Sequence, residues 1–286
     1  MALPETSTIL PWRGDLIAED FVPAKPLTRA TVAIRLLLLV VMLTTVYALT
    51  TIDYQSVDLP QAIADTIDNL KIIFLEPGGS HITFAQALYE VVITLGLAFL
   101  TTLLGGFIAL FLGLLGAQNL APKRITNVIK AFVAFIRAVP TILWVLIFAV
   151  AAGLGSAAAV IGMTFHSISY LTKAYSESFE DLDRSVIEAL RASGADWWQI
   201  VFQAVIPSSF TYLLSWTFLR FEINFANAVA MGAAAGAAGV GFDLFMASTY
   251  YFDLHGVGLI TYIILIFAMA METAATRMKS QIKNAH

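Results

Sequence analysis

The chain alternates between long hydrophobic runs and short polar segments, and the runs have the length of membrane-crossing helices. A helix needs about 20 mostly apolar residues to cross the ~30 Å hydrocarbon core of a bilayer. Six such spans are predicted, at about residues 32–50, 91–117, 132–152, 156–172, 205–221 and 257–275. Gly153-Leu154-Gly155 supplies the turn between the third and the fourth. The pattern therefore predicts an all-α integral membrane protein with six transmembrane helices.

A stretch of alanine, glycine and other small residues, Ala226 to Val240, follows the fifth span. It is too short and too rich in glycine for a stable crossing helix. We interpret it as a re-entrant or broken segment inside the protein, because non-helical backbone at membrane depth survives only there. An extramembrane loop is the alternative.

Composition agrees with a membrane protein and excludes several other classes. Hydrophobic residues make up 59% of the chain and charged residues 13%, with a mean hydropathy of +0.81. Soluble domains carry about 25% charged residues, so a soluble enzyme and a disordered scaffold are disfavoured. The net charge of −4 with no basic stripe argues against nucleic-acid binding. The lack of cysteine excludes disulfides, iron–sulfur clusters and thiolate zinc sites.

The positions of the basic residues predict the orientation in the membrane. All of the 16 Lys and Arg residues except Lys71 and Arg220 fall on the side that holds both termini, which is therefore cytoplasmic. The predicted order is a cytoplasmic N-terminal extension (1–31), the first span (32–50), an external loop (51–84), a core (85–275) and a cytoplasmic tail (276–286). The extension has no apolar core of a signal peptide, so no cleavage is expected.

The least hydrophobic part of the core is the cytoplasmic segment 175–203, between the fourth and fifth spans. Its charges fit two short helices separated at Gly194, where glycine permits a sharp turn without a Cβ clash. Pro207 falls in the first turn of the fifth span, where its missing N–H costs nothing.

This segment resembles the EAA loop of bacterial ABC importer permeases, and Glu188, Ala189, Gly194 and Pro207 fall in register with that motif. Leu190, Ala204 and Ile206 depart from it at apolar positions. Three stretches narrow the resemblance to the phosphonate/phosphite permeases: Ala134–Pro140, Glu188–Ala195 and Arg220–Asn224. The similarity covers residue 85 to the C-terminus. Gly236-Ala-Ala-Gly239-Val-Gly241 stands where that group usually has Gly-Ala-Gly-Gly-Ile-Gly, which leaves the substrate open.

The resemblance implies a type I ABC importer permease in the bacterial cytoplasmic membrane, in contact with lipid. Its partners would be a second permease chain, expected to form a homodimer, two cytoplasmic ABC ATPases and an external binding protein. The cargo would be phosphonate, phosphite or a related small phosphorus oxyanion. No Gly-x-x-x-x-Gly-Lys-Ser/Thr sequence occurs, so ATP and Mg²⁺ belong to the ATPases, and the chain is a transport subunit without a cofactor. The expected coupling residues are Glu188, Ala189, Arg191, Gly194 and Pro207.

Candidate pathway or gate residues are Arg137, Pro140, Arg220, Glu222, Asn224 and Asn227. Arg220, expected near the outer end of the fifth span, would either bind the oxyanion through paired N–H groups or snorkel outward or pair with Glu222 of a second protomer. The two asparagines would satisfy backbone groups of the broken segment or face the pathway. Arg137 would mark an inner gate before the kink at Pro140, or anchor the helix.

Four further polar residues have a structural explanation as well as a functional one. His166 is expected to be a hydrogen-bonded packing residue, and Asp243, Asp253 and His255 would meet a binding protein or be solvated. Rival functions are a phosphate or methionine ABC permease, an ion-driven transporter and an intramembrane enzyme. An ion-driven transporter should carry mid-membrane carboxylates. Spans one to four have none, and no convergent catalytic set appears.

Overall fold

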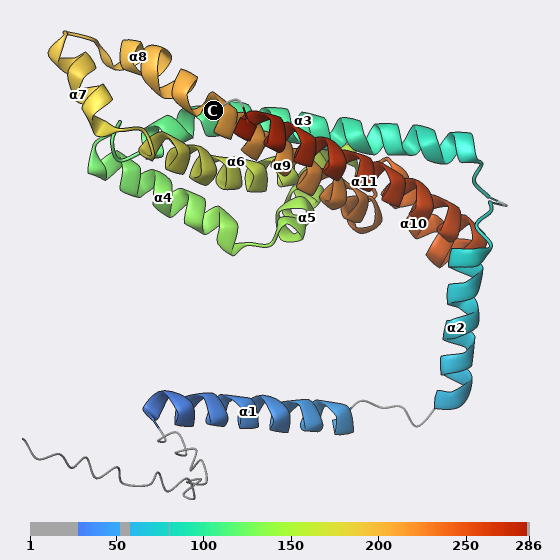
Figure 1. The fold of residues 1–286 in the computed structure, drawn as a ribbon. Coiled ribbons are helices and arrows are strands. Elements are labelled where there is room, and N and C mark those ends of the chain that lie inside the picture. Colours follow the sequence, from blue (N-terminus) through green and yellow to red (C-terminus); the bar gives the residue numbers. More distant parts are fainter. Residues whose placement is uncertain (1–27, 52–57, 80, 285–286) are drawn as a thin grey trace, which may run out of the picture. The chain divides into compact units, whose positions relative to one another are not determined.

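The computed structural model describes the backbone of residues 28–51, 58–79 and 81–284 and the side chains up to Arg277. In these ranges, helices are the only regular secondary structure (Figure 1). Most of the expected N-terminal extension and residues 52–57 of the external loop lie outside them. The chain divides into two units, residues 1–62 and 63–286.

The first unit contains α1 (Arg29–Thr51), which confirms the first predicted span as a helix. Large apolar side chains on all sides of α1, from Ile34 to Leu49, are more than half exposed or nearly so. A helix that is apolar all round is typical of a membrane span, and its exposed surface suits contact with lipid.

The second unit is a helical bundle organised around α3 (Phe84–Gly116), α6 (Ser156–Glu180) and α9 (Ile206–Ala235), which pack on one another. Thr83 begins α3 with a capping box, in which its side chain and that of Gln86 satisfy each other's backbone N–H. Buried positions on α3 recur every three or four residues, from Ala87 and Val91 to Gly113 and Gly116, so one face of this apolar helix is the packed one.

Shorter helices complete the second unit. They are α2 (Leu59–Leu75, which begins in the first unit), α4 (Lys123–Ala138), α5 (Thr141–Ala152), α7 (Arg184–Ala192), α8 (Trp197–Ile200) and α10 (Val240–Phe245). α11 (Leu254–Asn284) ends the described chain, and π-helical turns occupy Val201–Val205 and Met246–Tyr250. Within the bundle, α7 and α8 lie at one end and α10 at the other (Figure 1).

Three described helices are long and apolar enough to cross a membrane: α1, α3 and the first 24 residues of α11. Two bent pairs also qualify if each is one span. These are α4 with α5, bent by 86°, and the continuous run Trp197–Ala235 with Val240–Tyr250, bent by 52°. The fourth predicted span, 156–172, lies within α6.

The structure corrects three expectations from the sequence. The predicted third span is two helices, because Pro140 lacks an N–H and starts α5 after the bend. Residues 226–235 continue α9, and only Gly236–Gly239 interrupts the helix, with Gly236 left-handed at φ 63°. The loop expected at 51–84 contains α2, whose apolar Ile63, Ile67, Leu70 and Phe74 share one face.

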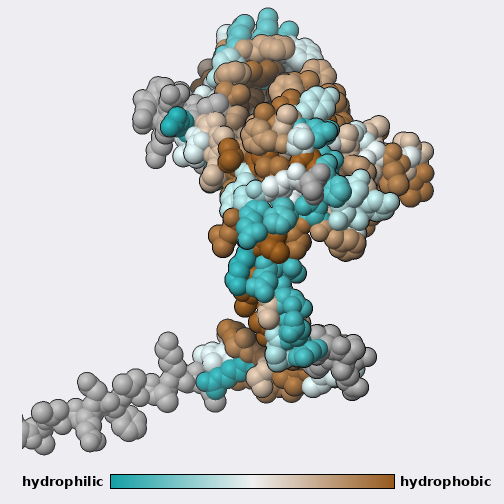
Figure 2. Space-filling view, turned by 90° about the vertical axis from the view of Figure 1, so that its right-hand side faces the viewer, coloured by the Kyte–Doolittle hydropathy of each residue, from teal (hydrophilic) through white to brown (hydrophobic). Residues whose placement is uncertain are grey.

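The surface of the bundle exposes many large apolar side chains. Figure 2, which views the end that carries α10, shows hydrophobic patches between hydrophilic ones. Phe107, Ile147 and Phe210 are each more than half exposed. Soluble monomers rarely expose contiguous apolar patches of this kind, so the exposure agrees with a bundle that contacts lipid or other chains.

Candidate functional site

The segment between α6 and α9 forms a helical hairpin, as the sequence predicts. α7 and α8 are joined by a turn at Gly194, whose φ of 88° strains residues other than glycine. Asp183 caps α7 by accepting the N–H of Ser185 at 2.9 Å, and this hydrogen bond holds the pKa of Asp183 below its ordinary value. We refer to residues 183–200 as the coupling hairpin.

The coupling hairpin turns its motif residues outward and its apolar residues inward. Glu188, Ala189 and Arg191 are exposed, whereas Ile187 is 2% exposed and packs in a core cluster with Phe179 and Ile200. The exposed residues are available to a partner while the buried ones hold the hairpin to the bundle. The amphipathic pattern of α7 thus leaves these three residues on its accessible face.

Hydrogen bonds fasten the hairpin and the end of α6 to the connection between α3 and α4. The indole Nε1 of Trp197 donates to the Leu120 carbonyl oxygen at 3.0 Å, and Asn119 Nδ2 donates to the Phe179 carbonyl oxygen at 2.8 Å. Asp196 and Gln199 form a capping box at α8. Neither Asn119 nor Trp197 was predicted to take part. Asn119 lies between the second and third predicted spans and Trp197 within the segment 175–203, and only the polar amide and the indole N–H mark them in the sequence.

Pro207 is exposed in the first turn of α9, as predicted. The helix does not begin there, however, because α8 runs into the π-helical turn Val201–Val205 and then into α9. A proline removes one i→i−4 hydrogen bond and crowds the preceding turn. The wider π turn, in which Ile206 N–H donates to the Val201 carbonyl oxygen, accommodates it.

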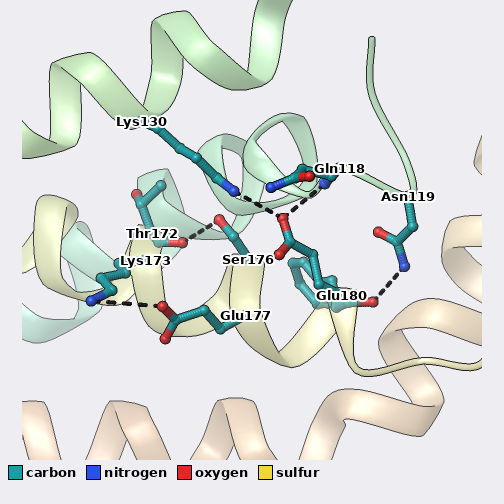
Figure 3. A network of polar contacts seen from close by, with 9 residues as sticks. Gln118, Asn119, Lys130, Thr172, Lys173, Ser176, Glu177 and Glu180 are labelled. Atoms are coloured by element: carbon teal, nitrogen blue, oxygen red, sulfur yellow. Dashed lines mark hydrogen bonds and ion pairs between the residues drawn. The ribbon is translucent and has the colours of Figure 1, made fainter. Parts of the chain in front are cut away.

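A cavity of about 470 Å³ opens between α4 and α6, near the base of the coupling hairpin. Its lining mixes charged, hydroxyl and apolar side chains, namely Ile129, Lys130, Val133, Ala134, Arg137, Thr172, Lys173, Ser176, Glu177 and Glu180. Figure 3 shows Lys130 and the backbone of Gln118 meeting at the Glu180 carboxylate, with distances of 3.2 and 2.9 Å to Oε1. The structure thus places Arg137 in a charged cavity, two residues before the bend at Val139-Pro140.

Arg220 lies in the middle of α9 and not at its outer end. The helix rises about 20 Å from its start to Arg220 at ~1.5 Å per residue and continues to Ala235. The side chain is 2% exposed, so the predicted outward snorkelling is wrong. Its Nε donates to Ser167 Oγ at 3.0 Å, its Cζ lies 5.2 Å from the centroid of the Tyr170 ring, and its Nη2 has no hydrogen-bond partner among the described residues.

Asn224 lies one turn beyond Arg220 and shares its partner. Asn224 Nδ2 donates to Ser167 Oγ and to Thr102 Oγ1, both at 2.9 Å. The expectation that Asn224 satisfies backbone groups of a broken segment is therefore wrong, because the helix is intact there and the amide joins three helices. We call Thr102, Ser167, Arg220 and Asn224 the polar centre.

The other predicted pathway residues stand apart from the polar centre. Glu222 and Asn227 are half-buried on α9, and in the described structure neither side chain has a hydrogen bond or ion pair. His166 is half-buried, but its Nδ1 has no hydrogen-bond partner in this part of the chain, so the expected hydrogen bond is absent. The structure does not bring these three side chains together with the cavity at Arg137.

Three polar residues singled out from the sequence, Asp243, Asp253 and His255, lie in α10 and at the start of α11. Asp253 is buried and caps α11, accepting the N–H of Gly256 at 2.9 Å. His255 Nδ1 lies 2.7 Å from the Glu76 carbonyl oxygen. Asp243 borders a cavity of about 280 Å³ with Glu90 and His81.

The similar proteins of known name are permease proteins of import or transport systems. The phosphate-import permease protein PhnE of Mycolicibacterium smegmatis is 30% identical over 62% of this chain, but that match spans only 33% of PhnE. The phosphite transport system permease protein PtxC of Stutzerimonas stutzeri is 28% identical over 66% of this chain and 69% of its own length. The probable D-methionine transport system permease protein MetI of Pasteurella multocida is 26% identical over 52% of this chain.

Solved structures share the fold. An inward-facing MetNI methionine ABC transporter matches with a TM-score of 0.60 and 20% identity, covering 68% of this chain and 94% of that one. An amino acid ABC transporter matches with a TM-score of 0.56 and 16% identity over 81% of this chain. The profile of one family matches residues 105–278, which hold α6, the coupling hairpin, α9 and α10. The chain therefore belongs to the family of binding-protein-dependent transport system inner membrane components.

Proposed function

We propose that this chain is the permease subunit of an ATP-driven importer for phosphonate, phosphite or a related small phosphorus oxyanion. The observation that carries the proposal is the coupling hairpin, which exposes Glu188 and Arg191 while apolar packing and the Trp197 bond fix its base. A permease without a nucleotide site must receive work from another chain. A short helix held rigidly to the bundle is a means of receiving it.

The proposed assembly pairs two permease chains, expected to be two copies of this one. Two cytoplasmic ATPases bind the hairpins, and an external binding protein delivers the cargo to the opposite end. Hydrolysis of ATP takes place in the ATPases, and both termini of this chain are cytoplasmic. Closure of the ATPases moves the hairpins and switches access between the two faces.

The substrate class rests on the relatives whose names refer to phosphate or phosphite import. A second candidate is import of another small solute such as methionine, which the more distant methionine permease relatives and the fold neighbours favour. The two candidates differ in a simple competition experiment, because a phosphorus oxyanion and a zwitterionic amino acid do not share a binding protein.

The test uses the complete transporter in proteoliposomes, with ATP inside and loaded binding protein outside. Uptake of phosphite, methylphosphonate and phosphate is measured, with methionine as the competing candidate, together with ATPase stimulation by loaded over empty binding protein. Uptake of a phosphorus oxyanion that requires both ATP and the binding protein is expected. Uptake of methionine and of none of the phosphorus compounds would favour the second candidate substrate. Uptake by the chain without an ATPase would overturn the proposal.

A further inference from the structure

The cavity between α4 and α6 contains more cationic than carboxylate groups. Lys130, Arg137 and Lys173 border it, against Glu177 and Glu180. Each lysine already faces a carboxylate, since Lys130 Nζ lies 3.2 Å from Glu180 Oε1 and Lys173 Nζ lies 3.6 Å from Glu177 Oε1. Arg137 has neither an ion pair nor a side-chain hydrogen bond among the described residues. One positive charge of the cavity is therefore not neutralised.

Thr172 supplies a second polar group to the same cavity. Its side chain is 1% exposed, and its Oγ1 has no hydrogen-bond partner in the described structure, although its own carbonyl oxygen accepts from Ser176. Figure 3 shows the side chain turned toward α4. A buried hydroxyl without a partner costs free energy, so a ligand that accepts its hydrogen would recover that cost.

The apolar wall strengthens these groups. Ile129, Val133 and Ala134 from α4 line the cavity beside the charges, and charges attract a ligand more strongly next to a low-dielectric wall than in open water. The volume of about 470 Å³ lies within the range of small-molecule sites, ~300–1,000 Å³. It leaves room for a tetrahedral oxyanion with some of its water.

We propose that this cavity binds a phosphorus oxyanion through the Arg137 guanidinium, with the Thr172 hydroxyl as a further donor. A guanidinium presents parallel N–H groups that match two oxygens of such an ion. Glu180 is kept from repelling the ion by Lys130 and by the Gln118 N–H, both of which bind its carboxylate. The inference rests on the proposed function, because it takes the imported oxyanion, after translocation, as the ligand.

The same chemistry fits the phosphate of an anionic lipid headgroup, so the experiment separates the two sources. The complete transporter without ATP or binding protein is placed in nanodiscs of phosphatidylcholine, and phosphite binding is measured by ³¹P line broadening. Arg137→Gln is expected to weaken binding about tenfold or more, the scale of one lost charged hydrogen bond. Thr172→Val is expected to weaken it less. Arg124→Gln, an exposed arginine of α4 outside the cavity, is the control.

Nanodiscs that contain phosphatidylglycerol then identify the source. Phosphite binding to the wild type that is undiminished by phosphatidylglycerol supports the imported ion. Loss of the Arg137-dependent phosphite binding from the wild type in these nanodiscs assigns the site to a headgroup phosphate. Phosphite binding that is absent, or equal in the wild type and Arg137→Gln, overturns the site. The proposed function fails separately, through absence of ATP-driven uptake by wild-type proteoliposomes.

Discussion

The contact between α3 and α6 at Gly105 tests whether close helix packing supports the polar centre. A Cβ at Gly105 would lie 2.6 Å from Ser167 Cβ and 3.4 Å from the Ile168 backbone nitrogen. Carbon atoms in optimal contact are ~3.5–4.0 Å apart, so Gly105→Ala must separate the helices by about an ångström. Ser167 accepts hydrogen bonds from Arg220 and Asn224, and the displacement reaches both.

The free-energy cost of this overpacking is obtained by comparison with a second glycine of α3. A Cβ at Gly96 meets no atom within 4 Å, so Gly96→Ala changes helix propensity alone, a gain of up to ~1 kcal/mol. Gly105→Ala has the same gain but adds an overpacking cost of about 1–3 kcal/mol. The difference in unfolding free energy between the two variants therefore isolates the packing cost.

The assay is thermal unfolding of the assembled transporter in nanodiscs at one scan rate, with ATP-driven uptake measured in parallel. Gly105→Ala is expected to melt at least about 2 °C below Gly96→Ala, because 1 kcal/mol shifts the Tm of a chain of this size by ~2–4 °C. Uptake should fall in Gly105→Ala only. Equal melting temperatures would refute the reasoning, since they would show that α3 and α6 separate at no cost.

Three further predictions concern the polar centre and the coupling hairpin. Ser167→Ala removes the hydrogen-bond acceptor of Arg220 Nε and one of the two acceptors of Asn224 Nδ2. It should lower the free energy of unfolding by about 1–3 kcal/mol in the same melting assay. The control Ser215→Ala, which loses only a bond within α9, should lower it less. Glu188→Ala should lower both uptake and ATPase stimulation by the loaded binding protein, with assembly unchanged. Glu272→Ala, which changes an exposed glutamate of α11, should lower neither. Normal stimulation in Glu188→Ala would show that Glu188 does not take part in coupling. Because the pKa of Asp183 is lowered in the folded chain, the stabilisation by its cap is fully present above the ordinary value near 3.8 and is lost as pH falls from there through the lowered value. The protection of the α7 amides against hydrogen exchange, relative to the intrinsic rate at each pH, should therefore be constant from pH 5 to 8 and lower in acid. At pH 7, Asp183→Ala should reduce this protection and Asp183→Asn should keep it, since Asn also caps. Unchanged protection in Asp183→Ala would show that the cap does not hold α7.

The coupling hairpin was predictable because its signals are local. A left-handed turn needs glycine, a helix start favours aspartate, and the alternation of exposed Glu188 with buried Ile187 follows helical periodicity. The position of Arg220 was not predictable in the same way. Its depth depends on where α9 ends, and composition suggested an end near Phe221, whereas packing of Gly232 against the backbone of Gly241 and Phe242 allows the helix to continue.

The cavity and the polar centre could not be predicted from the sequence either, because both depend on tertiary packing. Lys130 and Glu180 are 50 positions apart, and Asn224 and Thr102 are 122 apart. Nothing in the spacing of either pair along the chain predicts contact, because it depends on how α3, α4, α6 and α9 pack. Arg137 was identified from its place before Pro140, but only the tertiary structure shows that it faces a cavity.

The α3–α6 pair connects the polar centre to the coupling hairpin. Added Cβ atoms at Gly105, Gly113 and Gly116 would lie 2.6, 3.0 and 2.7 Å from Ser167, Tyr175 and Ser176, so the two helices touch closely over three turns. At the end of this contact, Asn119 and Gln118 bond to Phe179 and Glu180, at the base of the hairpin. Helices packed this closely resist sliding, because interlocked surfaces are bistable and not continuously deformable. A partner that displaces the hairpin therefore moves α3 and α6 as one body, and the polar centre moves with them.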